Sequence, residues 1–208
     1  KTLAVCAGAA SGSSVAAAVQ SVADASYSYT TTKSKGKQRS LQKVVFAVQD
    51  RAAVKSAFDR ACATVTGVEL AKEWANRPGN HATPTHLAKA AQQLAKQPRI
   101  TTEVLGPREV AKLGMGAFLA VAKGSEEPLR FIVMKYQGAP KSSAPVVLVG
   151  KGITFDTGGI SLKPAAEMDE MKFDMGGAAS VLGTFAALAE LQPAINAVGL
   201  IPSCENMP

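Results

Sequence analysis

Short apolar runs alternate with polar stretches over the first 52 residues, and this pattern predicts a small α/β unit. Leu3–Ala7 and Val44–Val48 are apolar runs of strand length, while Ser14–Ala23 is rich in small residues and long enough for a helix. A polar, lysine-rich loop lies between that helix and the second run. We therefore expect residues 1–52 to form part of a small N-terminal α/β domain.

Apolar residues then recur at helical spacing over residues 52–75. They are Ala53, Phe58, Ala61, Val65, Val68, Leu70, Ala71 and Trp74. Only Gly67 breaks this spacing, and the segment Asn76–Asn80 contains a Pro and a Gly, which end a helix. We expect residues 53–80 to form a linker helix that leads into a second domain over residues 81–208.

Strand and helix signals alternate in the second domain. Thr83 is the predicted N-cap, and Pro84 the first-turn residue, of a helix over His86–Gln97. Further strands are predicted at Thr102–Leu105, Phe131–Tyr136, Val146–Val149 and Asn196–Ile201, with a long helix at Gly177–Leu191. Because residues 146–201 form a βαβ unit, parallel pairing is expected there. The predicted fold class is α/β, with a mixed or mostly parallel sheet flanked by helices.

The loop of residues 150–176 follows one of these strands. In open α/β sheets ligands bind beyond the carboxyl ends of the strands, so this loop is the predicted position of a site. It contains two glycine-rich stretches, Gly150–Lys163 and Met171–Ala179, the second of which runs on into the long helix.

Composition limits the classes of protein that fit. The chain has 208 residues, 47% of them hydrophobic, which is enough for a sizeable core. No apolar run approaches the roughly 18 residues that a membrane span needs, so we expect no membrane association. Three widely spaced cysteines predict no disulfide framework and fit a reducing compartment. The chain opens on Lys1–Val5 with no initiator Met and no signal peptide, so we expect it to begin inside a longer protein.

The formal net charge is +7, and part of it lies in the run from Lys33 to Lys43. Basic runs can bind nucleic acid, but this one lies among Thr, Ser and Gly without aromatic residues, which favours a solvated loop. The chain has only two histidines, His81 and His86. Any metal must therefore be held by oxygen ligands, with or without an amine.

The sequence of this loop does not match several familiar motifs. A phosphate-binding P-loop needs Ser or Thr after its lysine, and Gly152 stands there. A dinucleotide fingerprint needs Gly where Phe155 stands, and a nucleophile elbow needs Gly where Lys163 stands. Ser161 and Lys163 could form a Ser–Lys hydrolase pair, so an amidohydrolase of that type stays open.

Lys151, Asp156 and Asp174 remain as candidate metal ligands in the loop. Hard divalent cations prefer oxygen ligands, and a carboxylate can bridge two of them. A lysine amine ligates a metal only in its neutral form, which two nearby dications favour. The spacing of these three residues fits a second interpretation equally well, in which both aspartates cap turns and the lysine is solvated.

The stretch from Gly150 to Ala179 resembles the metal-binding signature of the leucyl (cytosol) aminopeptidase family. Weaker similarity extends the resemblance over most of residues 70–208. It is found in the segments Asn76–Pro84, Gly114–Ala117, Tyr136–Pro140 and Glu205–Pro208.

The resemblance implies roles for five residues. Lys151, Asp156 and Asp174 match the family's metal ligands, with Asp156 bridging two ions. Lys163 matches the catalytic lysine, and Met171 matches a wall of the pocket for the first side chain of the substrate. The implied cofactors are two divalent ions, Mn²⁺ or Zn²⁺ and alternatively Mg²⁺, with bicarbonate as a proton carrier.

The same resemblance implies a cytoplasmic homo-hexamer that releases N-terminal residues, leucine in particular, from peptides. Residues 81–208 would be the first part of its metal-binding catalytic domain. The family's remaining ligands and catalytic Arg lie in an Asn-Thr-Asp-Ala-Glu-Gly-Arg segment that is absent up to Pro208, so we expect the chain to be truncated. The Ser–Lys amidohydrolase and a DNA-binding role of the Lys33–Lys43 run are the alternatives.

Overall fold

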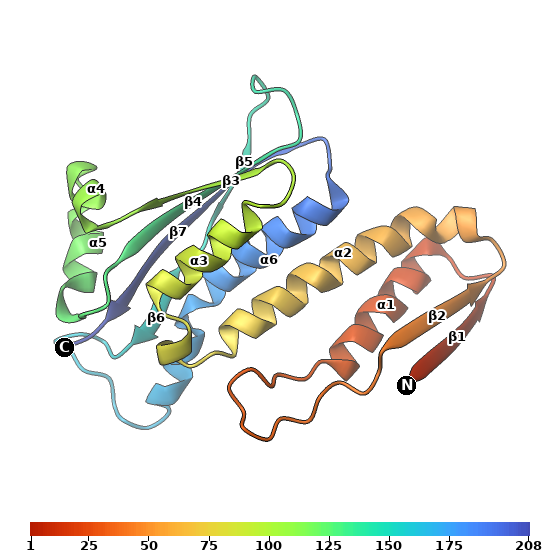
Figure 1. Cartoon of the computed structure of the whole chain (residues 1–208), viewed down its shortest axis with the longest axis horizontal. Coiled ribbons are helices and arrows are strands. Elements are labelled where there is room, and N and C mark those ends of the chain that lie inside the picture. The colour runs from red at the N-terminus through yellow and green to blue at the C-terminus, as the bar shows by residue number, and fades with distance from the viewer.

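The computed structural model describes residues 1–208, and its N-terminal part is a two-stranded sheet covered by helices (Figure 1). Strands β1 (Thr2–Gly8) and β2 (Lys43–Val48) pair in parallel, and helix α1 (Gly12–Ser26) connects them. Ser11 caps α1 by accepting a hydrogen bond from the N–H of Ser14. The small α/β unit predicted from the apolar runs is therefore present.

Helix α2 (Arg51–Ala75) continues without a break through Gly67. The Asp50 side chain begins it by accepting hydrogen bonds from two backbone N–H groups. Gly67 is buried where α2 crosses α6 (Gly176–Leu191), and a Cβ added there would lie 3.1 Å from the carbonyl carbon of Gly183. The glycine that breaks the apolar spacing thus allows two helices to approach closely.

The larger sheet has five strands and both kinds of pairing. Its order is β3 (Ile100–Leu105), β4 (Arg130–Gln137), β7 (Asn196–Asn206) and β5 (Val146–Val149), with β6 (Gly152–Asp156) also on β7. Strands β3, β4 and β7 are antiparallel neighbours, whereas β5 and β6 run parallel to β7. The α/β class with a mixed, helix-flanked sheet is confirmed.

Helices cover both faces of this sheet. Alternate residues of β4, Ile132 among them, pack with α6 and with α3 (Pro84–Leu94) in the main core. Phe131, which points the other way, packs near α4 (Pro107–Lys112) and α5 (Gly116–Val121). These two short helices were not predicted. The main core also contains Trp74 of α2. Helix α2 lies between α1 and α6 in Figure 1.

Strand β6 corrects the prediction that residues 150–176 form one loop. Strands β5 and β6 pair with successive stretches of β7, so together they make one edge strand that is interrupted at Gly150 and Lys151. Only a few residues separate the glycines around β6, too few to give a clear strand period in the sequence. The rest of the segment includes a 3₁₀ helix over Met168–Met175.

Short 3₁₀ turns complete the chain at Gly79–His81 and Ala122–Gly124. Thr83 caps α3 as predicted, with its hydroxyl accepting the His86 N–H. None of the helices has both the length and the hydrophobicity that a membrane crossing requires. The division into residues 1–52, 53–80 and 81–208 stays a prediction.

Candidate metal centre

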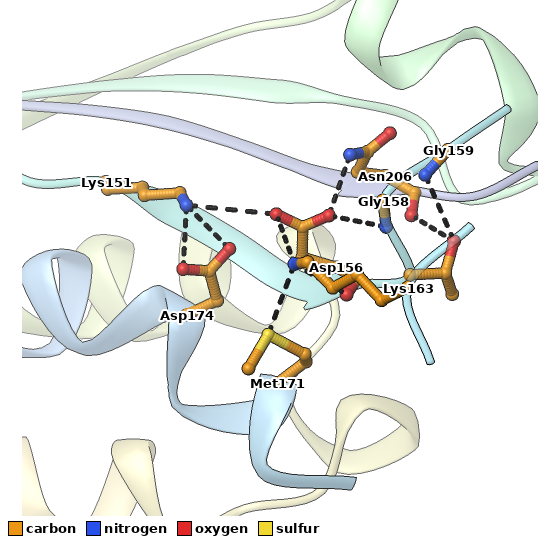
Figure 2. A network of polar contacts seen from close by, with 9 residues as sticks. Lys151, Asp156, Gly158, Gly159, Lys163, Met171, Asp174 and Asn206 are labelled. Carbon is orange, nitrogen blue, oxygen red and sulfur yellow. Dashed lines mark hydrogen bonds and ion pairs between the residues drawn. The ribbon is translucent and has the colours of Figure 1, made fainter. Parts of the chain in front are cut away.

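The candidate site lies at the interruption of the edge strand (Figure 2). Lys151 follows β5, Asp156 ends β6, and Asp174 lies on the 3₁₀ helix that leads into α6. Lys163 belongs to the loop after β6, and Met171 lies one turn before Asp174. All five residues predicted for the site therefore meet in one network at the carboxyl ends of β5 and β6.

Two glycines hold Lys151 beside the start of α6. A Cβ added to Gly150 would lie 2.6 Å from the carbonyl carbon of Gly177, and one added to Gly177 would lie 2.7 Å from the nitrogen of Lys151. The N–H of Ala178 donates to the carbonyl of Lys151 at 2.9 Å. Since backbone approaches backbone here, larger residues would push Lys151 away from Asp174.

The Lys151 ammonium group is paired with Asp174. Its Nζ lies 2.7 Å from each carboxylate oxygen of Asp174 and 3.9 Å from Oδ2 of Asp156. The lysine side chain is 58% exposed, whereas those of Asp156 and Asp174 are 14% and 20% exposed. Two largely buried carboxylates thus face one exposed amine.

Asp156 is held through one of its two carboxylate oxygens. Oδ1 accepts hydrogen bonds from the Gly158 N–H at 2.9 Å and from Nδ2 of Asn206 at 2.7 Å. Oδ2 faces the Lys163 ammonium at 3.2 Å. Burial raises the pKa of Asp156, but its hydrogen bonds, that from Gly158 foremost, together lower this pKa to about 2. Asp156 is therefore an anion at neutral pH.

A tight turn brings Lys163 back over Asp156. Gly158 and Gly159 adopt positive φ angles of 94° and 70°, and the Lys163 N–H closes the turn on the Thr157 carbonyl at 2.8 Å. A Cβ at Gly158 would lie 3.1 Å from the Lys163 nitrogen, so this position requires glycine. The Lys163 Nζ then donates to the Asp156 carbonyl at 3.1 Å.

Nothing in this geometry supports a Ser–Lys pair. Besides Asp156, Lys163 Nζ contacts the sulfur of Met171 at 3.2 Å. Ser161 is exposed, and no hydrogen bond joins its hydroxyl to Lys163. A serine nucleophile needs its base within hydrogen-bond reach, and Lys163 is turned toward Asp156 instead.

The donor set suits a hard divalent cation. The chain brings together no cluster of three or more His, Cys, Asp and Glu residues, so the group that it offers here is two carboxylates and the Lys151 amine. Oδ2 of Asp174 is buried and accepts no hydrogen bond, although it faces the Lys151 charge. An anionic oxygen left in this state is a suitable metal ligand.

Cys204 on β7 does not join Asp156 and Asp174 in a cluster that could hold a metal ion. Its side chain is buried, and burial together with the charge of Asp156 raises the pKa of its thiol to about 11. Asn206 is not among the site residues predicted from the sequence. It lies in the segment Glu205–Pro208, which carries part of the family resemblance, but only strand pairing places it against Asp156.

Fold and site together define an α/β protein with a candidate divalent-cation centre at the carboxyl edge of its sheet. Residues 69–208 match the model of the cytosol aminopeptidase family, catalytic domain. The chain belongs to this family.

Relatives from bacteria are similar over nearly the whole chain. A probable cytosol aminopeptidase of Polaromonas naphthalenivorans is 69% identical over 93% of the chain. One of Verminephrobacter eiseniae is 63% identical over 100% of it. The chain spans 38% and 40% of the lengths of these two relatives.

A solved structure has the same fold. The bottromycin maturation enzyme BotP in complex with Mn superposes with a TM-score of 0.80 at 34% sequence identity. The match covers 95% of this chain and 41% of that one. The similarity therefore extends through both sheets of the chain.

Proposed function

We propose that this chain forms part of a metal-dependent aminopeptidase that releases N-terminal residues, leucine in particular, from peptides. The observation that carries the proposal is the meeting of Lys151, Asp156 and Asp174 beside Lys163 on glycine-rich turns. Relatives named probable cytosol aminopeptidase support it at up to 70% identity.

Lys151, Asp156 and Asp174 would hold two divalent ions, with Asp156 shared between them. Mn²⁺ or Zn²⁺ are the proposed ions, with Mg²⁺ as an alternative, and Mn is the ion named for BotP. When bound, such ions supply Lewis acidity for the hydrolysis of a peptide bond. Three ligands do not fill two coordination spheres, so the remaining ligands would come from an Asn-Thr-Asp-x-Glu-Gly-Arg segment outside this chain.

Lys151 has to exchange its ion pair for a metal. In this structure the Lys151 ammonium group forms an ion pair with Asp174 at 2.7 Å. A lysine that ligates a metal must first release a proton, so metal loading at this site would be linked to proton release. The exposed position of Lys151 leaves that proton a direct path to water.

Lys163 would act on the substrate by its charge. Its ammonium group donates to the Asp156 carbonyl and to the Met171 sulfur, and it also faces Oδ2 of Asp156 at 3.2 Å. A fixed cation next to the scissile carbonyl stabilises the negative charge that develops on the carbonyl oxygen. The two contacts orient this charge before substrate arrives.

Met171 would line the pocket for the first side chain of the substrate. It is partly buried on the 3₁₀ helix, beside Lys163. Its flexible thioether can adapt to an aliphatic side chain of the leucine type.

A cytoplasmic homo-hexamer is the proposed state of the whole protein, and bicarbonate its proposed proton carrier. The names of the relatives support a cytosolic location, as do three cysteines that are all free. No contact of the basic run favours nucleic acid: Arg39 is paired with Glu69 on α2, and Lys33, Lys35 and Lys37 are exposed.

The test compares two aspartates of the same 3₁₀ helix in the full-length protein. Asp174→Asn should lower bound Mn²⁺ and the hydrolysis of a leucine anilide by more than about tenfold. Asp169→Asn is the matched control, because Asp169 is exposed and forms no ion pair, and it should change neither. Parent activity should vanish after dialysis against a chelator and return with Mn²⁺. Full activity after that dialysis would refute the proposal.

A further inference from the structure

Asn206 contacts the end of β6 through both its side chain and its backbone. It lies opposite Asp156 in the parallel pairing of β6 with β7. Its Nδ2 donates to Oδ1 of Asp156 at 2.7 Å. Its carbonyl oxygen accepts the N–H of Thr157 at 2.9 Å and the Thr157 hydroxyl at 2.8 Å. Asn206 thus holds two consecutive residues of the site.

The orientation of the Asn206 amide follows from its neighbours. If the amide were flipped, its oxygen would lie 2.7 Å from the anionic Oδ1 of Asp156, and the two oxygens would repel. On its other side the amide oxygen lies against Gly159, where an added Cβ would approach it to 2.7 Å. The side chain is therefore confined, with its N–H₂ group toward Asp156.

This contact makes the two oxygens of Asp156 different. Oδ1 accepts two hydrogen bonds, from Gly158 and Asn206, which occupy its two lone-pair positions. Oδ2 accepts no backbone or amide N–H and instead faces the ammonium groups of Lys163 at 3.2 Å and Lys151 at 3.9 Å. Figure 2 shows the hydrogen bonds on one side of the carboxylate and the charges on the other.

We infer that Asn206 is a positioning residue that directs Oδ2 of Asp156 toward the divalent ions. This inference rests on the proposed function, because it concerns the same metal centre. Asn206 touches neither ion nor substrate in this role and acts only through the Asp156 carboxylate. Residues that orient a metal ligand in this way contribute to affinity, and their loss commonly weakens metal binding by about 10- to 100-fold.

The same strand offers a matched control at its other end. Asn196, the first residue of β7, binds the loop before β5 by donating to the carbonyls of Pro140 and Ser143 and accepting the Ala139 N–H. The Asn196 side chain therefore has a structural role, at the end of β7 opposite the metal centre. Replacement of Asn196 should affect stability without affecting the site.

The experiment is a Mn²⁺ titration of the full-length protein after removal of metal, by calorimetry, for the parent and for Asn206→Ala and Asn196→Ala. Asn206→Ala should weaken Mn²⁺ binding by about 10- to 100-fold, and Asn196→Ala should leave it within about twofold of the parent. Electron paramagnetic resonance of the Mn²⁺-saturated proteins should differ from the parent for Asn206→Ala alone, since only there does the ligand geometry change. Thermal unfolding of the metal-free proteins separates these effects from general destabilisation.

Each outcome is decisive. Unchanged Mn²⁺ affinity and an unchanged spectrum in Asn206→Ala, with a parent that binds Mn²⁺, would overturn the role of Asn206 and leave the proposed function intact. Equal losses in Asn206→Ala and Asn196→Ala would also overturn it, because they would indicate a structural effect. A parent that binds no Mn²⁺ would overturn both proposals. If Asn206→Ala does not fold, Asn206→Leu, which keeps a similar shape without a donor, replaces it under the same criteria.

Discussion

Gly158→Ala should lower turnover strongly while Lys151, Asp156 and Asp174 are all kept. Gly158 has a φ angle of 94°, which an L-residue adopts at a cost of about 1–3 kcal/mol. Its added Cβ would also meet the carbonyl oxygen of Ser161 and lie 3.1 Å from two atoms of Lys163, and such overpacking costs about 1–3 kcal/mol.

The contacts that hold this turn closed contribute little free energy to oppose this strain. Lys163 is 37% exposed, and a partly exposed ion pair such as its contact with Asp156 contributes about 0–1 kcal/mol. We therefore expect the turn to open and Lys163 to leave its position. Because the loss of one group that stabilises an oxyanion costs about 10²–10³ in kcat, a decrease of that size is expected.

Gly114→Ala is the control for backbone strain alone. Gly114 has a φ angle of 71° and no atom within 4 Å of an added Cβ, so it shares the conformation of Gly158 without the close contacts. The assay is the steady-state hydrolysis of a leucine anilide by the Mn²⁺-loaded full-length protein, with bound metal measured in parallel. If Gly158→Ala and Gly114→Ala had the same kcat, the proposed link between this turn and Lys163 would be wrong.

Three further predictions concern single side chains. Lys163→Ala should lower kcat by about 10²–10³ with metal content nearly unchanged, whereas Asp156→Ala should lose both metal and activity; equal metal loss in the two would show that Lys163 is misassigned. Ser161→Ala should keep most activity, since its exposed hydroxyl contacts neither Lys163 nor Asp156, and loss of turnover in this variant would revive the Ser–Lys mechanism. In the metal-free protein, the pKa of Asp156 is lowered from 3.8 to about 2, so the contribution of this carboxylate to stability is present above the unfolded-state pKa and is lost as pH falls toward 2. Asp156→Asn should flatten this part of the acid unfolding curve, and an unchanged curve would contradict the hydrogen bonds described for Asp156.

Much of the backbone structure could be predicted from the sequence because its signals are local. The apolar runs at Val44–Val48 and Val146–Val149 are strands, and Thr83 with Pro84 begins a helix, as predicted. Caps and periodic side chains act within a few residues of themselves, so they are visible without a fold. The glycine-rich stretch after Val149 also indicated where candidate ligands would meet, although their roles as ligands stay a proposal.

Other features were decided only by tertiary structure, because they depend on partners far away in the chain. Residues Gly152–Asp156 become a strand through pairing with β7, some fifty residues later, and the same pairing brings Asn206 onto Asp156. Gly67 breaks a pattern in the sequence but lies at a helix crossing in the fold, where its lack of a side chain lets α2 approach Gly183. The sequence determines which groups each segment can offer, whereas the close approach of distant backbones determines which of those groups meet and how the carboxylate of Asp156 is oriented.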